Sequence, residues 1–288
     1  SVNGTFFTVE GRVTDEDKLR REIYEILKPY FSTALGKRVN NLLEALRLEA
    51  YAPDLPIQRD RIHVANGTLF LDGRFTSERE FCRNRLPVAY NENAELSETW
   101  LRFLGELLYP EDIPTLQEFM GYCFLPTTKG QKMLMLIGRG GEGKSRIGVV
   151  LRALLGSNMA TGSIAKIESS RFARADLEHE LVMLDDDMKL EALPQTNHIK
   201  AIVTAELPMD LERKGQQSYQ GDLYVRFLGF GNGSLKALYD RSEGFFRRQI
   251  ILTTKPKDAK RVDNPFIAEK MCAEAEGIFL WCLEGLRR

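Results

Sequence analysis

Apolar residues recur with a helical spacing over some stretches of the chain and in strand-like runs over others. From residue 15 to residue 51 the spacing is helical, and a break at Pro29–Gly36 divides it into two helices. Residues 62–71 instead predict a short β segment, with Asn66-Gly67 as its hairpin turn. Helical spacing returns between residues 96 and 124. The front of the chain is therefore expected to be a small, mostly helical module with a short β segment.

The rest of the chain alternates apolar strands with helices. We expect strands at Lys132–Ile137, Glu180–Leu184, Tyr224–Leu228 and Arg248–Leu252. This alternation is typical of α/β proteins in which helices cover both faces of a mainly parallel sheet, giving three layers. The expected division is a front module of residues 1–110, followed by a core of residues 111–288.

Composition narrows the classes of partner. The 288 residues leave room for two domains, and a net charge of −1 argues against a protein that coats nucleic acid through overall positive charge. Any DNA contact must then come from local basic loops. Four cysteines without a C-x-x-C pair, and only three histidines, argue against a zinc site and for reduced thiols in the cytosol. No apolar stretch approaches the roughly 20 residues of a membrane span, so no membrane partner is expected.

One segment, Gly138–Ser145, matches the phosphate-binding pattern G-x-x-x-x-G-K-[ST] in full. It follows an apolar run and precedes a predicted helix, so its N–H groups and the helix dipole are placed to bind phosphate oxygens. Lys144 is expected to reach the β- and γ-phosphates, and the Ser145 hydroxyl to ligate Mg²⁺. A glycine-rich turn with an exposed lysine is the alternative. We predict ATP and Mg²⁺ as cofactors, bound by Gly138, Arg139, Gly140, Gly141, Glu142, Gly143, Lys144, Ser145 and Arg146.

Acidic residues follow the second of these strands. The run that ends at Leu184 continues into Asp185, Asp186 and Asp187. A carboxylate pair at the end of a buried strand is what a phosphate-loop ATPase uses to hold Mg²⁺ and to orient the attacking water. We predict that Asp185 and Asp186 have both the catalytic and the metal-binding roles, and that Asp187 is a solvated turn residue. A surface turn is the alternative for all three.

Polar groups at the later strands complete the candidate site. Asn232 follows the third strand, where its side chain could sense the γ-phosphate, although a plain Asn-Gly turn is the alternative. Residues 208–221 predict a hairpin whose tip carries Arg213 and Lys214, suited to phosphate contacts that ignore base identity, or else a solvated loop. Arg247 and Arg248 are adjacent at the start of the fourth strand, so one can pack while the other projects as an arginine finger.

Together these motifs resemble the superfamily 3 helicases, in particular the helicase half of phage, plasmid and poxvirus primase–helicases. The segments 62–69, 85–94 and 116–125 also resemble the module that precedes the ATPase in that family. The resemblance implies an AAA+-like core, assembly into a hexameric ring, and movement along single-stranded DNA, typically 3′ to 5′. It also implies a cytoplasmic location in a bacterial host, and a primase or origin-binding domain on flanking sequence or on another chain.

The resemblance assigns a role to each motif. Gly138–Ser145 resembles the Walker A loop, and Asp185 and Asp186 resemble the Walker B carboxylates. The Arg213–Lys214 hairpin resembles the element that grips single-stranded or forked DNA in the ring channel. Asn232 matches the sensor, and Arg248, with Arg247 as second choice, matches the arginine finger. The phosphate loop departs from the family in one residue, since Glu142 replaces an asparagine and could repel phosphates unless it points away from them.

The expected function is an ATP-dependent DNA helicase motor in the replication of a phage, plasmid or other mobile element. Two alternatives stay open. A small-molecule kinase shares the phosphate loop, but it predicts a monomer or dimer that ignores DNA. An AAA+-like initiator or loader predicts assembly and DNA binding with negligible unwinding.

Overall fold

A computed structural model describes residues 1, 5–52, 55–188, 196–233, 243–258 and 262–288. Its centre is a five-stranded sheet in which every neighbouring pair of strands is parallel. Across the sheet, the strands follow the order β12 (Gln249–Thr253), β6 (Met133–Gly138), β11 (Arg226–Asn232), β8 (Val182–Met188) and β7 (Met159–Thr161). The carboxyl ends of β6, β8 and β11 therefore meet at one edge of the sheet, where the chemistry is expected.

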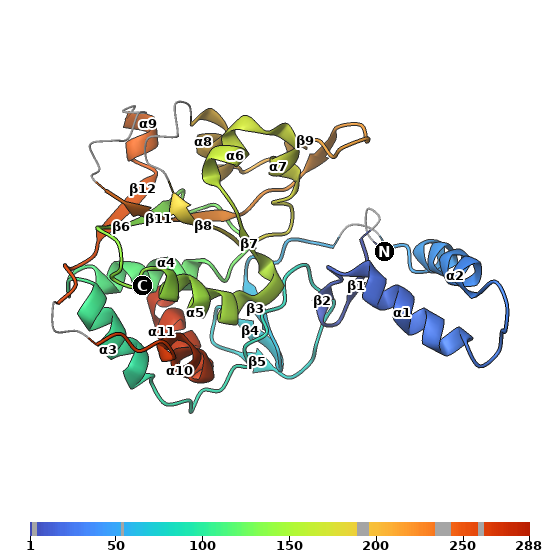
Figure 1. The fold of residues 1–288 in the computed structure, drawn as a ribbon, viewed down its shortest axis with the longest axis horizontal. Coiled ribbons are helices and arrows are strands. Elements are labelled where there is room, and N and C mark those ends of the chain that lie inside the picture. Colours follow the sequence, from blue (N-terminus) through green and yellow to red (C-terminus); the bar gives the residue numbers. More distant parts are fainter. Residues whose placement is uncertain (2–4, 53–54, 189–195, 234–242, 259–261) are drawn as a thin grey trace.

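Helices cover both faces of this sheet (Figure 1). One face packs on α6 (Ile164–Ser169), α7 (Arg171–Ala175) and α8 (Asn197–Val203), and its core is lined by residues such as Met133 and Phe227. The other face packs on α4 (Ile113–Tyr122), α5 (Ser145–Leu155) and α11 (Ala275–Arg287). The predicted fold class, a three-layer α/β core with a mainly parallel sheet and a smaller front part, is confirmed.

The elements of the front part pack into two separate apolar cores. The three-stranded antiparallel sheet β3 (Arg61–Val64), β4 (Gly67–Phe70), β5 (Phe75–Thr76) and helix α3 (Glu98–Leu107) contribute to the same apolar core as α4, α5 and α11. Helices α1 (Glu16–Leu27) and α2 (Leu35–Glu49) instead pack around a small cluster of their own, whose buried members are Ile23, Val39 and Leu43. One core thus continues across residue 110, while the boundary placed there from the sequence stays a prediction.

Short elements connect these layers. A two-stranded ribbon, β1 (Phe7–Thr8) and β2 (Gly11–Arg12), precedes α1, and a second one, β9 (Met209–Leu211) and β10 (Tyr219–Gly221), forms the hairpin predicted over residues 208–221. The 3₁₀ turn η1 (Gly156–Asn158) follows α5, α9 (Glu243–Phe246) precedes β12, and α10 (Ile267–Ala273) precedes α11. Among the described residues, no helix has both the length and the apolar character needed to span a membrane.

Helices α4 and α11 approach each other at backbone distance. A Cβ atom on Gly121 would lie 2.2 Å from the carbonyl oxygen of Cys282, and one on Gly285 would lie 2.5 Å from the backbone of Gln117. No side chain fits in either place, so glycine permits this contact. It holds a helix from the middle of the chain against one near residue 280, and Trp100 meets Trp281 in the core beside it.

Three details differ from the sequence prediction. The β3–β4 turn consists of Ala65 and Asn66, one residue earlier than expected, because Gly67 already pairs with Val64. Strand β7 was not predicted, since three residues are too few to show a period. Strand β8 does not stop at Leu184 but runs through the three aspartates to Met188, because β11 extends alongside it.

Candidate nucleotide-binding site

The phosphate loop lies between the end of β6 at Gly138 and the start of α5 at Ser145, as the sequence predicts. Gly140, Gly141 and Gly143 have φ angles of 106°, 81° and 107°. Residues with a Cβ atom rarely adopt such φ angles. The glycines therefore allow the backbone of the loop to curl so that its N–H groups point inward. This geometry, a glycine-rich loop that leads into the N-terminus of a helix, is typical of sites that bind phosphate.

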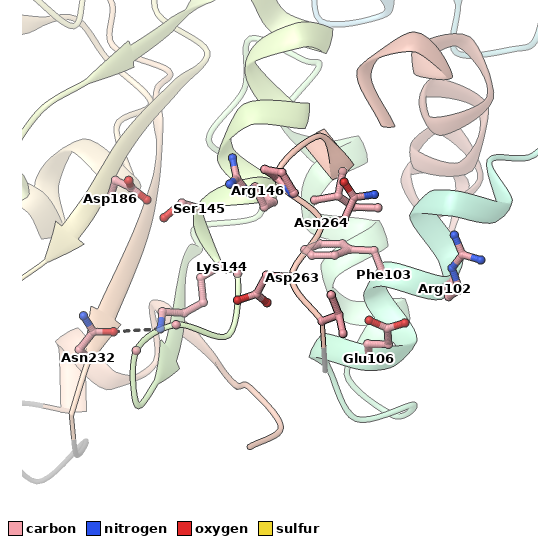
Figure 2. A pocket seen from close by; sticks show the side chains of 16 residues that line it. Arg102, Phe103, Glu106, Lys144, Ser145, Arg146, Asp186, Asn232, Asp263 and Asn264 are labelled. Carbon is pink, nitrogen blue, oxygen red and sulfur yellow. Dashed lines mark hydrogen bonds between the residues drawn. The ribbon is translucent and has the colours of Figure 1, made fainter. Parts of the chain in front are cut away.

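Lys144 and Asn232 meet across this edge of the sheet (Figure 2). Asn232 is the last residue of β11 and lies beside Gly138 in the strand register. Its side-chain oxygen accepts a hydrogen bond from the Lys144 ammonium at 2.9 Å. The structure thus brings together two predicted site residues that are 88 positions apart in the chain.

Glu142 also points at Lys144, not at the solvent. Its carboxylate lies 3.0 Å from the Lys144 ammonium and accepts N–H groups of Arg139 and Gly140 at 2.5 and 3.0 Å. The side chain is only 3% exposed. Burial alone would raise the pKa of Glu142, but the hydrogen bonds from Lys144 and from the loop N–H groups hold this pKa below its ordinary value. The carboxylate is therefore ionised at neutral pH, and its charge is compensated inside the loop.

Gly138 makes this arrangement possible. A Cβ atom at this position would lie 2.4 Å from the Thr254 hydroxyl, 2.8 Å from the Lys144 ammonium and 2.9 Å from the Glu142 carboxylate. Three polar side chains thus converge over a residue that has no side chain of its own. The first glycine of the motif is explained here by close approach.

Strand alternation separates the predicted carboxylate pair, and a bulge in β8 follows Asp185. Asp185 lies opposite Gly229 of β11 and Met188 lies opposite Gly231, so Asp186 and Asp187 together face a single partner residue. Consecutive strand residues point to opposite faces of a sheet, so Asp186 lies on the face of Leu184 and Asp185 on the face of Met183. The bulge then returns Met188 to the face of Met183. Asp186 is exposed and lines the same cleft as Lys144 and Ser145 (Figure 2).

Asp185 lies on the other face of the sheet. Its carboxylate accepts the N–H of Ile164 at 2.8 Å and so holds the start of α6. Burial raises the pKa of Asp185, against the effect of that hydrogen bond. Only Asp186 of the predicted pair reaches the cleft, and a role for Asp185 in nucleotide chemistry stays a prediction. Asp187 is exposed, as expected, but it lies within the strand and not in a turn.

The cleft above the phosphate loop has a volume of about 910 Å³. Its near wall consists of predicted residues, namely Gly140, Gly141, Gly143, Lys144, Ser145, Arg146, Asp186 and Asn232. Its far wall comes from α3, with Arg102, Phe103 and Glu106, and from the segment of residues 262–267 (Figure 2). Sequence reasoning missed this far wall, because these residues belong to no phosphate-binding motif and lie in segments far apart along the chain.

Arg248 lies at the amino-terminal end of the parallel strands, opposite the end that carries the phosphate loop. It directly precedes β12, whose first residue, Gln249, is level with Met133 at the start of β6. Five strand residues separate that level from Gly138, or roughly 17 Å at about 3.3 Å per residue. The Arg248 guanidinium donates to the carbonyl of Gly244, whereas the side chain of Arg247 is exposed. Neither arginine lines this chain's own cleft.

The β9–β10 hairpin places its two basic residues differently. Arg213 forms an ion pair of 2.7 Å with Glu178, which also accepts the Tyr219 hydroxyl at 2.6 Å. Burial and Glu178 raise the pKa of Tyr219 to about 12. Lys214 is exposed in the turn. Of the two residues predicted to bind DNA, Lys214 projects freely from the tip, and Arg213 is held against the body of the core.

The protein and its cleft resemble known proteins to a limited degree. Residues 136–248, less than half of the chain, match a family of unknown function (DUF5906). This segment begins in β6 and ends at Arg248, so it holds the phosphate loop, the aspartates and Asn232. No curated protein gives a significant match.

Two solved structures share the fold. Both are of the NrS-1 C-terminal region without ligand: the A form matches with a TM-score of 0.60 at 12% identity, and a second apo structure, covering residues 305–718, matches with 0.59 at 13%. Each match covers 99% of this chain and 68% of the other. At this identity the likeness concerns the fold alone.

The residues present fit a Mg²⁺-bound nucleotide. Magnesium bound with a nucleotide usually takes one or two protein oxygens and completes its coordination with phosphates and water. Ser145 and Asp186 line the same cleft and supply such oxygens. Within the described ranges there is no cluster of three or more His, Cys, Asp or Glu side chains that could hold a metal ion without a nucleotide. This donor set suits an ion that arrives with its substrate.

Proposed function

We propose that the chain is an ATP-hydrolysing motor of DNA replication, with the helicase activity expected from its motifs. The observation that carries the proposal is the meeting of Lys144, Asn232, Ser145 and Asp186 at one cleft on the carboxyl edge of a parallel sheet. The likeness to the NrS-1 C-terminal region supports the same fold class. The cleft volume of about 910 Å³ is large enough for a nucleoside triphosphate.

Each side chain has a task in hydrolysis. The β- and γ-phosphates are bound by the Lys144 ammonium and by loop N–H groups other than those of Arg139 and Gly140, which Glu142 accepts. The loop glycines let the backbone approach the phosphates. Mg²⁺ bound with the nucleotide would be held by Ser145 and Asp186, and it neutralises charge on the phosphate oxygens. Asp186 accepts a hydrogen bond from the attacking water and so orients it. Asn232 detects the γ-phosphate indirectly, because the Lys144 ammonium contacts both the phosphate and the Asn232 side chain.

The placement of Arg248 favours a shared site. An arginine near the γ-phosphate stabilises the transition state of phosphoryl transfer. Arg248 lies at the amino-terminal end of the parallel strands, roughly 17 Å from the loop by strand rise, too far to reach this chain's own nucleotide. We therefore assign it to the nucleotide of a neighbouring copy. A ring of such copies, hexameric in the resemblance, would carry the β9–β10 hairpins around a channel for single-stranded DNA.

A self-contained kinase is the second candidate. Arg102 and Arg146 line the cleft within the same chain, and a kinase needs arginines of this kind to bind its transferred phosphate. Such an enzyme would hydrolyse or transfer phosphate at a rate per chain that does not depend on protein concentration or on DNA.

The test is the ATPase rate per chain over a series of protein concentrations, with and without single-stranded DNA. A motor with shared sites gives a rate that rises cooperatively with concentration and rises again with DNA. Lys144→Ala should abolish turnover, whereas Lys37→Ala, which removes an exposed lysine from α2, should not. A constant rate that is indifferent to DNA would instead support the kinase, and normal turnover in Lys144→Ala would refute the site.

A further inference from the structure

The Lys144 ammonium is held from two sides. It carries three N–H donors, and two of them have acceptors: the Glu142 carboxylate at 3.0 Å and the Asn232 side-chain oxygen at 2.9 Å. Lys144 nevertheless lines the cleft. Because the ammonium is tetrahedral, fixing two of its N–H groups also fixes the direction of the third. This third N–H is left for a ligand in the cleft.

Glu142 lies behind the loop. Gly140, Gly141, Gly143 and Lys144 line the cleft, but Glu142 is not among the lining residues and its side chain is only 3% exposed. One carboxylate oxygen accepts the N–H groups of Arg139 and Gly140, and the other accepts from Gly140 and from Lys144. The carboxylate therefore braces the loop with one oxygen and the lysine with the other.

We infer that Glu142 is a positioning residue for the proposed reaction: from behind the phosphate loop it fixes the Lys144 ammonium so that the remaining N–H faces the γ-phosphate. The inference rests on the proposed function. A free lysine side chain has four rotatable bonds, and a held one meets the transition state without reorganising. The carboxylate that could have repelled phosphates thus contributes to catalysis through Lys144.

The same carboxylate weakens the binding of ATP itself. It places one negative charge beside the site of a polyphosphate, and it is ionised at neutral pH because Lys144 and the loop N–H groups compensate its burial. Removing the charge should strengthen binding, while removing the contact with Lys144 should slow turnover. A positioning role therefore predicts that binding and turnover move in opposite directions, whereas damage to the fold would weaken both.

Two substitutions separate these effects. In Glu142→Gln, the amide oxygen can still accept the Arg139 and Gly140 N–H groups, but the amide NH₂ then faces Lys144 and cannot hold it. We expect ATP to bind as tightly as in the parent chain or more tightly, and kcat at saturating ATP to fall roughly tenfold. In Glu142→Asp the charge stays but the carboxylate no longer reaches Lys144, so kcat should fall without any gain in binding.

Binding is measured by calorimetry with Mg²⁺ and a non-hydrolysable ATP analogue, turnover by phosphate release, and folding by the thermal unfolding midpoint. Glu22→Gln, which neutralises an exposed carboxylate in α1, is the control and should match the parent chain. The inference is overturned if both Glu142 variants keep kcat within about twofold of the parent, or if binding and turnover fall together. Failure of the parent chain to bind the analogue would instead refute the proposed function.

Discussion

The alternation of side chains along β8 decides which aspartate faces the cleft. Asp186 continues the row of Leu184 and points toward Ser145, while Asp185 continues the row of Met183 and caps α6 on the other face. The two neighbours therefore have different chemistry. Asp186 is solvated beside the phosphate site, and Asp185 is buried with a raised pKa, so that an uncharged acceptor would suit its place.

Substituting each aspartate by asparagine tests this division. Asp186→Asn should lower kcat about 100-fold or more, because an amide neither holds Mg²⁺ as strongly nor accepts a proton from water. Asp185→Asn keeps an oxygen for the Ile164 N–H and should stay within about threefold of the parent rate. Steady-state ATPase assays on both variants are sufficient, and the opposite ranking would show that Asp185 is the working carboxylate.

At this scale the sequence predicted the phosphate loop well and the carboxylates only in part. The loop motif fixes backbone geometry through its glycines, so the positions of Lys144 and Ser145 follow from the motif itself. The strand before the aspartates was expected to end at Leu184, whereas β8 runs on to Met188 because β11, more than 35 residues away in sequence, extends alongside it. The alternation that separates Asp185 from Asp186 thus depends on a distant strand, so the choice between them could not be made from the chain alone.

The hairpin of β3 and β4 carries a buried histidine that links its stability to pH. His63 lies between Thr68 at 3.1 Å and Gln58 at 2.6 Å. Burial, helped by the nearby positive charge of Arg85, lowers the pKa of His63 to about 4. The unfolded chain, with an ordinary pKa near 6.5, then binds a proton between pH 6.5 and pH 4 that the folded chain does not.

Stability should therefore fall as the pH drops through this window. The contribution of His63 amounts to about 2 kcal/mol lost between pH 7 and pH 5, from the difference between the two pKa values. Urea unfolding at the two pH values measures the loss, and His63→Gln, which cannot titrate, should reduce it by that amount. An equal loss in parent and variant would show that other groups, such as half-buried His179, account for the effect.

At the scale of elements, length determined what could be predicted. The strands β6, β8, β11 and β12 have five to seven residues each and contain apolar runs, so they were expected, although their ends moved. The three-residue β7 gives no periodic signal, and it forms because the edge of β8 offers unpaired backbone groups. Helices α1 and α2 were visible from spacing alone, since each carries an apolar stripe.

In our proposal, each catalytic site consists of the phosphate loop of one copy and Arg248 of the next. Mixing two inactive variants tests this division. Lys144→Ala keeps its Arg248, and Arg248→Ala keeps its phosphate loop, so an interface between the two can hold one complete site. Equimolar mixing should restore activity to about a quarter of the parent rate, the share of interfaces that combine both intact groups. ATPase rates of the separate and mixed variants measure this, and a mixture as inactive as its components would place the site within one chain.

Whole-molecule features were the least accessible from the sequence. The three-layer class followed from the alternation of strands and helices. The far wall of the cleft did not, because α3 and the segment around Asn264 meet only when the entire core is assembled. The packing of α3 on the same core as α11 could not be predicted for the same reason, since the two helices lie far apart along the chain.

The close contact between α4 and α11 has a consequence for how this chain is made. Gly121 and Gly285 bring together helices whose nearest ends are separated by more than 150 residues. Trp100 and Phe124 likewise contact Trp281 and Phe279, which are synthesised much later. At synthesis rates of about 5–20 residues per second, α4 is finished roughly 10–30 s before α11 is made. During that time, the surface of α4 that packs on α11 has no partner. A growing polypeptide of this kind offers chaperones on the ribosome a long period of access to its unfinished core.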